Sequence, residues 1–326
     1  MNELTLTFSW LLGQSIAASI IICLLLLIRK VLWHKFPARW TSLLWILLTL
    51  RMICPWLPES KLSLFNLFPH LENYSFFELL ESENSSYPLF SGNLRAPDTF
   101  DDTSTEEQKG DLHNHPESKH YSILEIATTI WLLGVAILSF HLLLATLTLW
   151  LLVKAERPLT KQKILDLLED CKKEMGIQTI IGLIPTDKIE SPALFGYLRP
   201  RLLFPKHHIT TLNEKELRHV FLHELAHLKR MDIYFGWLVS LLQIIHWFNP
   251  LVWYAFRQFR LDREIACDEL ALSVMKPIEP IEYGKTLINL LAEHATTRKL
   301  PALASVLEDG AYIKRRVTMI SRFKKK

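Results

Sequence analysis

The sequence predicts a mainly α-helical membrane protein whose C-terminal half adds a smaller α+β domain. Of the 326 residues, 49% are apolar and only 22% are charged, which is too apolar for a soluble domain of this length. The apolar residues are concentrated in long runs, and the charged residues are distributed unequally between the segments that separate those runs. The C-terminal half also shows patterns typical of amphipathic helices and short strands.

Three runs are long and apolar enough to be membrane spans. The first, residues 8–28, contains no charged residue and is long enough as a helix to cross a hydrocarbon core of about 30 Å. The second, residues 40–57, is interrupted only by Arg51, and the third, residues 123–153, contains His141. Because charged groups inside a membrane are costly, Arg51 is either a functional residue or one that bonds to backbone and lipid headgroups. The sequence favours neither interpretation.

The charges between the spans predict how the chain is oriented. The loop at residues 29–40 has four basic residues and no acidic one, which the positive-inside rule places in the cytoplasm. Residues 59–120 have twelve acidic and four basic residues, and we expect an extracytoplasmic segment there. This orientation predicts a multi-pass protein of the cell membrane with its N-terminus outside. Residues 1–58 then hold two transmembrane helices, residues 121–153 a third, and residues 154–326 a cytoplasmic domain.

The cytoplasmic domain is predicted to begin with two helices and a group of short strands. Residues 157–176 are amphipathic at helical spacing. Residues 179–205 are rich in β-branched and apolar residues interrupted by glycine and proline, which favours short strands. A second helix is expected at residues 214–230, because Asn213 and Glu216 have the spacing of a capping box.

The last of the strands is predicted to lie at the edge of its sheet. Pro200 and Pro205 cannot donate backbone hydrogen bonds, which confines residues 197–204 to an edge or a turn. A free edge can pair with an extended peptide. The candidate pairing residues are Tyr197, Leu198, Arg201 and Leu202.

The second helix contains the sequence HELAH at residues 223–227. His223 and His227 are four residues apart, so both imidazoles stand on one helix face where they can reach one metal ion. Glu224 lies beside them, within reach of a metal-bound water. This HExxH spacing is typical of zinc metalloproteases. The alternative is a helix with surface histidines, and the capping box and the carboxylates downstream favour the zinc site.

A catalytic zinc ion usually takes three protein ligands and leaves one position for water. The segment LDREIACDEL, residues 261–270, supplies the missing carboxylate. We favour Glu264 as the third ligand over Asp262 and Glu269. Asp268 follows one helical turn later and is able to hold a ligating histidine in the right tautomer.

This ligand set predicts hydrolysis of a peptide bond with one Zn²⁺ as cofactor. The ion lowers the pKa of its bound water, Glu224 takes the proton, and the hydroxide attacks the peptide carbonyl. Tyr283 and His294 are candidates for an additional oxyanion donor, although each is also explained as a packing or surface residue.

The stretch between the histidines and Glu264 creates a geometric conflict. It is apolar and long enough for a further span, which would place Glu264 about 30 Å from the histidines. The pair Asn249 and Pro250 interrupts the helix. We therefore expect a helical hairpin at residues 233–258, turned at residues 247–250, that dips into or lies against the membrane and returns Glu264 to the cytoplasmic face.

At these residues the chain resembles the BlaR/MecR-type membrane metalloproteases, the sensor-transducer antirepressors of bacterial β-lactam resistance. The most specific matches are HELAHLKRMD at residues 223–232 and HWFNPLVWYAFRQFRLDREIACDEL at residues 246–270. The resemblance implies a gluzincin-type zinc protease domain, with His223, His227 and Glu264 on the metal and Glu224 as base. It also implies that the substrate is a cytoplasmic winged-helix repressor.

The chain also departs from the β-lactam receptors. Those continue into a further span and an extracellular penicillin-binding domain, whereas SxxK occurs here at residues 273–276 and 321–324 without its partner motifs. We therefore expect a signal that acts through residues 59–120 or through a separate sensor protein. The expected partners are the membrane and a DNA-binding repressor as protein substrate, with no direct binding of nucleic acid. A homodimer is left open.

Two other functions remain alternatives. One is a housekeeping membrane zinc protease of the CAAX-prenyl or HtpX type, which shares HExxH and a later ExxxD. The acidic outer segment favours signalling, because a quality-control enzyme has no evident need for it. The other is a non-catalytic receptor scaffold. An open water position beside Glu224 argues against a scaffold, since structural zinc sites are closed by a fourth protein ligand.

Overall fold

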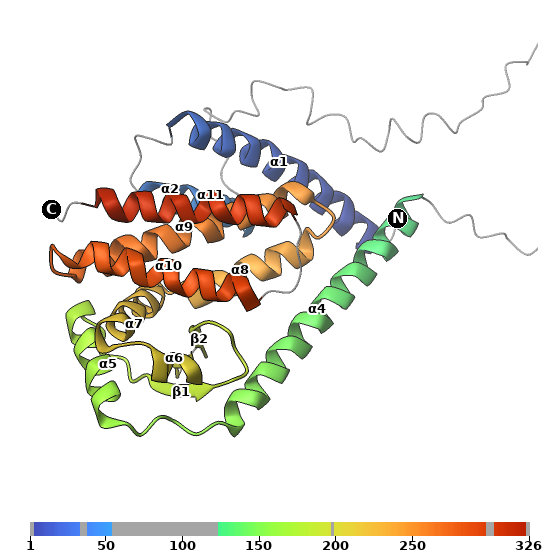
Figure 1. Ribbon diagram of the computed structural model, residues 1–326. Coiled ribbons are helices and arrows are strands. Elements are labelled where there is room, and N and C mark those ends of the chain that lie inside the picture. The colour runs from blue at the N-terminus through green and yellow to red at the C-terminus, as the bar shows by residue number, and fades with distance from the viewer. Residues whose placement is uncertain (1–2, 33–37, 54–122, 197–198, 298–302, 324–326) are drawn as a thin grey trace, which may run out of the picture. The chain divides into compact units, whose positions relative to one another are not determined.

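The computed structural model describes residues 3–32, 38–53, 123–196, 199–297 and 303–323 (Figure 1). This part of the chain is mainly helical, as the sequence predicts, with one small sheet. The predicted outer segment, residues 59–120, lies outside the described residues.

Two described helices have the length and composition of membrane spans. They are α1 (Glu3–Leu32), which is apolar over Glu3–Lys30, and α4 (Ile123–Ala155), which is apolar throughout. The helix α2 (Ala38–Ile53) has 16 residues, and Leu44–Ile53 is an apolar stretch among those whose side chains the structure describes. The described residues therefore support two of the three predicted spans by length. Many large apolar side chains of α1 and α4 are exposed, as expected where lipid covers a helix.

The arginine in the second predicted span bonds to a neighbouring helix. The Arg51 guanidinium Nη1 donates to Oε1 of Gln14 on α1 at 3.1 Å. This bond joins α1 to α2 through polar groups within two apolar helices. This bond is to a side chain, and not to the backbone or lipid headgroups that the sequence analysis considers, so both interpretations of Arg51 stay open.

The part of the chain after α4 begins with the predicted helix and short strands. The helix α5 (Gln162–Met175) ends at Gly176, whose φ of 68° is the left-handed conformation common after a helix. Three short strands follow, and then α6 (Lys206–Thr211) and α7 (Glu214–Lys229). Asn213 and Glu216 form the predicted capping box at the start of α7.

The small sheet has the strand order β1 (Gly182–Thr186), β3 (Arg201–Pro205), β2 (Ala193–Phe195). The strand β1 is parallel to β3, and β2 is antiparallel to it. The apolar face of α7 packs against this sheet and α5, where Phe221 and Leu222 join a core with Leu168 and Phe204. The sheet and α5 thus fix the direction of α7.

The position of the predicted edge strand needs correction. Arg201 and Leu202 lie in β3, the central strand, and both are paired with β1 on one side and β2 on the other. The prolines do not prevent this, because Pro200 precedes the strand and Pro205 ends it, so no interior donor is lost. The other two candidates, Tyr197 and Leu198, lie outside the described residues.

The predicted hairpin is formed by α8 (Asp232–Ile245) and α9 (Pro250–Val274). The two helices run antiparallel, since Arg260 Nη1 donates to Gln243 Oε1 at 3.2 Å and Arg263 Nη1 to the Asp232 carbonyl at 3.5 Å. The chain reverses between Ile245 and Pro250, where the sequence predicts a turn. Contact of this hairpin with the membrane stays a prediction. The chain continues into α10 (Glu279–Thr297) and α11 (Leu303–Arg322).

The helix α4 is fastened to the turn of the hairpin by two tryptophans. The indole of Trp131 donates to the carbonyl of Ile245 at 2.9 Å, and the indole of Trp247 donates to the carbonyl of Trp131 at 3.3 Å. Gly134 lies against the ring of Trp247, and a Cβ at this position would overlap the ring. The absence of a side chain at Gly134 therefore allows this contact.

We expect Gly134→Val to destabilise the protein by about 1–3 kcal/mol, because the Trp247 ring must move away and lose its hydrogen bond. Gly13→Val is the matched control, since this glycine is also in an apolar helix and a Cβ added there would have nothing within 4 Å. Thermal unfolding of the full chain in detergent measures both. Equal melting temperatures for the two variants would show that the contact has no structural role.

Candidate metal centre

Two histidines of α7 and one glutamate of α9 meet at one point. The His223 Nε2 atom lies 3.4 Å from Glu264 Oε2, and the His227 Nε2 atom lies 3.6 Å from Glu264 Oε1. The two imidazole rings are 4.9 Å apart at their centroids and nearly perpendicular. A tetrahedral zinc ion with bonds of about 2.0–2.1 Å would separate its ligand atoms by about 3.3–3.4 Å. The donor atoms and their spacing therefore fit a zinc ion.

The imidazole of His223 is held from behind by a buried acid. Its Nδ1 atom lies 3.1 Å from Asp268 Oδ1 and 3.1 Å from the Tyr283 hydroxyl, which itself donates to Asp268. These contacts place the proton on Nδ1 and leave the lone pair of Nε2 directed at Glu264. Asp268 thus has the position that the sequence suggests for it.

Asp268 is in turn fixed by an arginine that the sequence analysis does not single out. Arg316 on α11 donates from Nε to Oδ2 at 2.6 Å and from Nη2 to Oδ1 at 2.7 Å. Burial raises the pKa of Asp268, but the charge of Arg316 outweighs it and lowers the pKa to about 2. The carboxylate is therefore ionised and accepts from His223.

The imidazole of His227 is held by Asp232, which the sequence analysis also misses. Its Nδ1 atom lies 2.8 Å from Asp232 Oδ2, and the Cys267 thiol donates to the same oxygen at 3.1 Å. Met231 has a φ of 58°, a left-handed conformation that turns the chain after α7 and brings Asp232 back to the histidine. Its position directly after the HELAH helix is the only local signal for this role.

Glu224 is buried beside the ligands, with 8% of its surface exposed. Burial raises the pKa of its carboxyl group, while the charges of His227 and His223 act in the opposite direction. A glutamate whose pKa is raised is better suited to accept and then return a proton than one with an ordinary pKa.

These groups line a cavity of about 790 Å³. One wall comes from α4, which contributes the side chains of Leu142, Ala145, Thr146 and Leu149. The remaining lining residues come from β2 and the residues before it, Ser191–Phe195, and from α7, α8, α9 and α10. The sheet strand beside this cavity is thus β2, and a predicted membrane helix forms part of the wall.

The other candidate residues do not lie among the three proposed ligand atoms, although Tyr283 also lines the cavity. Asp262, 1% exposed, binds Arg29 at 3.1 Å, the Trp45 indole at 2.9 Å and Arg315 at 2.8 Å, and takes no part in the cluster. Glu269 is likewise absent from the metal-binding groups of the described residues. The Tyr283 hydroxyl lies on the Nδ1 side of His223, opposite the ligand atom. The His294 side chain lies outside the described residues.

Comparison with known proteins finds one matching family model and several similar proteins. A family model described as BlaR1 peptidase M56 matches residues 9–320. The regulatory protein BlaR1 of Bacillus licheniformis is 26% identical over 322 residues, which cover 96% of this chain and 50% of that protein. The methicillin resistance protein mecR1 of Staphylococcus aureus is 24% identical over 320 residues, covering 97% of this chain and 52% of that protein. The chain spans about half the length of these relatives.

We expect Asp268→Asn to weaken zinc binding by roughly 10–100-fold, because the substitution removes the charge that orients His223. Tyr283→Phe is a second test variant in case Asp268→Asn does not fold. It deletes one hydroxyl, keeps the pair of Asp268 with Arg316, and should also weaken zinc binding. Competition with a chromophoric chelator measures the affinity for zinc of the site formed by His223, His227 and Glu264. Glu269→Gln is the matched control on the same helix. An unchanged affinity in both test variants would contradict a supporting role for these residues.

Proposed function

Because the chain belongs to the BlaR1 peptidase M56 family, we propose that it is a membrane zinc endopeptidase acting in signal transduction. Its proposed substrate is a cytoplasmic winged-helix repressor, cleaved in response to an extracytoplasmic signal. The observation that carries this proposal is the convergence of His223, His227 and Glu264, with the buried Glu224 in the same cavity. Because the chain matches about half of each relative, the activity of the whole relatives enters only as part of this proposal.

The residues of the cavity divide the proposed reaction among them. When bound, Zn²⁺ supplies a Lewis acid that polarises the peptide carbonyl and acidifies water. His223, His227 and Glu264 would hold the ion, and Asp268 and Asp232 keep the two imidazoles oriented through Nδ1. The carboxylate of Glu224 accepts a proton from the attacking water and then donates it to the leaving amine. The pKa of Asp268 is lowered to about 2, which leaves Glu224, with its raised pKa, as the proton carrier.

The substrate peptide is proposed to pair with β2. This strand occupies an outer position in the sheet of the described residues, and Ala193, Leu194 and Phe195 line the cavity of the metal centre. A peptide added to this edge would receive main-chain hydrogen bonds and pass beside the proposed metal ligands. The apolar side chains that α4 contributes to the same cavity favour an apolar residue near the cleaved bond.

The proposed signal reaches the cavity through α4. This helix begins directly after the acidic segment in sequence, lines the cavity with Leu142 and Leu149, and is fastened to the hairpin through Trp131 and Trp247. Such a connection supports signalling over a housekeeping protease. A separate sensor protein or a homodimer would act on the same helix. A scaffold is disfavoured, because its function would not need the acid Glu224 beside the ligands.

We expect Glu224→Gln to lower peptidase activity by roughly 10²–10⁴-fold, because the reaction loses its proton carrier while all three metal ligands remain. Glu269→Gln is again the matched control. The measurement compares the cellular proteome with wild-type protein and with each variant, together with the zinc content of the purified chains. One stable cleaved protein that disappears in Glu224→Gln supports the proposal. Many affected proteins would favour quality control, and no difference with zinc still bound would favour a scaffold.

We expect cysteines introduced at Ser91 and Lys161 to be labelled from opposite sides of the membrane. The acidic segment holds Ser91, and the region after α4 holds Lys161. A membrane-impermeant maleimide added to intact cells should modify Ser91→Cys alone, and modify Lys161→Cys after the cells are opened. The wild-type chain with its native cysteines serves as the blank. Labelling of both positions in intact cells would refute the proposed orientation.

A further inference from the structure

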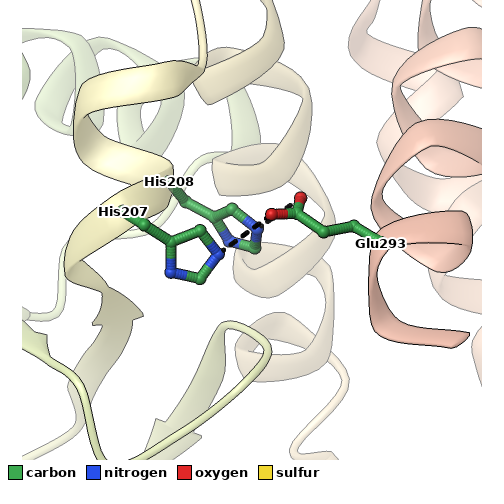
Figure 2. A group of neighbouring side chains, drawn as sticks. All are labelled: His207, His208 and Glu293. Atoms are coloured by element: carbon green, nitrogen blue, oxygen red, sulfur yellow. Dashed lines mark hydrogen bonds and ion pairs between the residues drawn. The ribbon is translucent and has the colours of Figure 1, made fainter. Parts of the chain in front are cut away.

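A second group of metal-binding side chains lies away from the HELAH motif. His207 and His208 are on α6, directly after the central strand, and Glu293 is on α10. Figure 2 shows both imidazoles directed at the Glu293 carboxylate. The His207 Nε2 atom is 3.3 Å from Glu293 Oε1, and the His208 Nε2 atom is 3.2 Å from Oε2. The group shares no residue with the first centre.

The convergence of two consecutive histidines is unusual for a helix. Neighbouring residues on an α-helix point about 100° apart, yet these two rings have centroids only 4.0 Å apart. Both Nε2 atoms are instead directed at the same carboxylate (Figure 2). A divalent cation between the three side chains would bind both imidazoles in their neutral form.

The distances between the donor atoms also fit a metal. Ligand atoms around a tetrahedral zinc ion with bonds of about 2.0–2.1 Å lie about 3.3–3.4 Å apart. The two nitrogen–oxygen distances here are 3.3 and 3.2 Å, close to the 3.4 and 3.6 Å found in the HELAH centre. All three donor atoms lie within 4.8 Å of one another. We propose that His207, His208 and Glu293 form a second divalent-metal site, which joins α6 to α10.

The donor set defines the class of ion. Two imidazoles and one carboxylate suit Zn²⁺ and other late first-row transition metals, whereas Ca²⁺ and Mg²⁺ prefer oxygen ligands. His208 is 3% exposed and its ring stands edge-on to Phe204 of the core, so this ligand is held in place by the fold. His207 and Glu293 are about half exposed, at 49% and 51%, which leaves room for water to complete the coordination.

A metal in this second site would hold α10 in place beside the first site. The helix α10 also carries Tyr283, which contacts His223, and Thr286, whose hydroxyl is 3.0 Å from His219 Nδ1 on α7. A metal bound between α6 and α10 fixes α10 in the position from which it supports the first centre. This inference goes beyond the proposed peptidase function and does not rest on it, because the second site would bind metal whether or not the first one is catalytic.

The zinc content of the full chain tests the second site. The protein, purified in detergent without a histidine tag, is equilibrated with chelator-buffered Zn²⁺. We expect two zinc ions in the wild type and one in Glu293→Gln or His207→Gln, whose exposed positions should spare the fold. We expect one in His223→Gln/His227→Gln, and none when Glu293→Gln is added to that pair. His141→Gln, an exposed histidine on α4, is the matched control and should keep two.

A wild type with one zinc ion that is lost in His223→Gln/His227→Gln would overturn the proposal, since the histidine–glutamate contacts would then be hydrogen bonds without metal. Thermal unfolding gives an independent measurement. In the His223→Gln/His227→Gln background, saturating Zn²⁺ should raise the melting temperature by a few degrees, because the ion binds the folded state alone. Adding Glu293→Gln or His207→Gln should remove this rise. A rise that persists in both variants would also overturn the proposal.

Discussion

The metal centre depends on one reversal of the chain, between α8 and α9. Without it, Glu264 would leave on the far side of an apolar segment and could not meet His223. Asn249 makes the reversal possible, since its Oδ1 accepts from the first backbone amides of α9 at 3.0 and 3.4 Å. Its Nδ2 donates to the hydroxyls of Ser15 and Ser19 on α1, at 2.7 and 2.8 Å. In apolar surroundings a polar side chain must have hydrogen-bond partners. Asn249 finds them by capping the start of α9 and by binding α1, a predicted span.

Two buried aspartates of α9 connect this helix to other helices of the protein. Asp262 joins α1, α2 and α11 through Arg29, Trp45 and Arg315, and Asp268 joins α11 to the metal centre through Arg316. A buried charge is costly unless it is paired and hydrogen-bonded, so each aspartate requires its partners to be in place. Arg315 and Arg316 are adjacent on α11. Through them, the helices that contact Asp262 are connected to Asp268, the residue that orients His223.

The sequence predicts those parts of the centre whose signals are local. The capping box, the spacing of HELAH and the break at Pro250 each depend on residues within one helical turn, and the structure has all three features. Arg316 could not be assigned in this way, because its partner lies on another helix and a basic C-terminal segment equally favours contact with anionic lipid. The central place of β3 was missed for a similar reason. Prolines indicate where a strand ends. Which strands lie beside it depends on pairing with distant segments, which prolines do not indicate.

The wall formed by α4 links the chemistry of the cavity to the position of a membrane helix. Glu224 has a raised pKa because it is buried, and a proton carrier near neutral pH requires that burial. Leu142, Ala145 and Leu149 contribute part of the apolar enclosure from α4. A displacement of α4 that admits water would return the pKa of Glu224 toward its ordinary value and remove the apolar wall beside β2. In the proposed function, the proton carrier and the peptide site would thus change together when α4 is displaced.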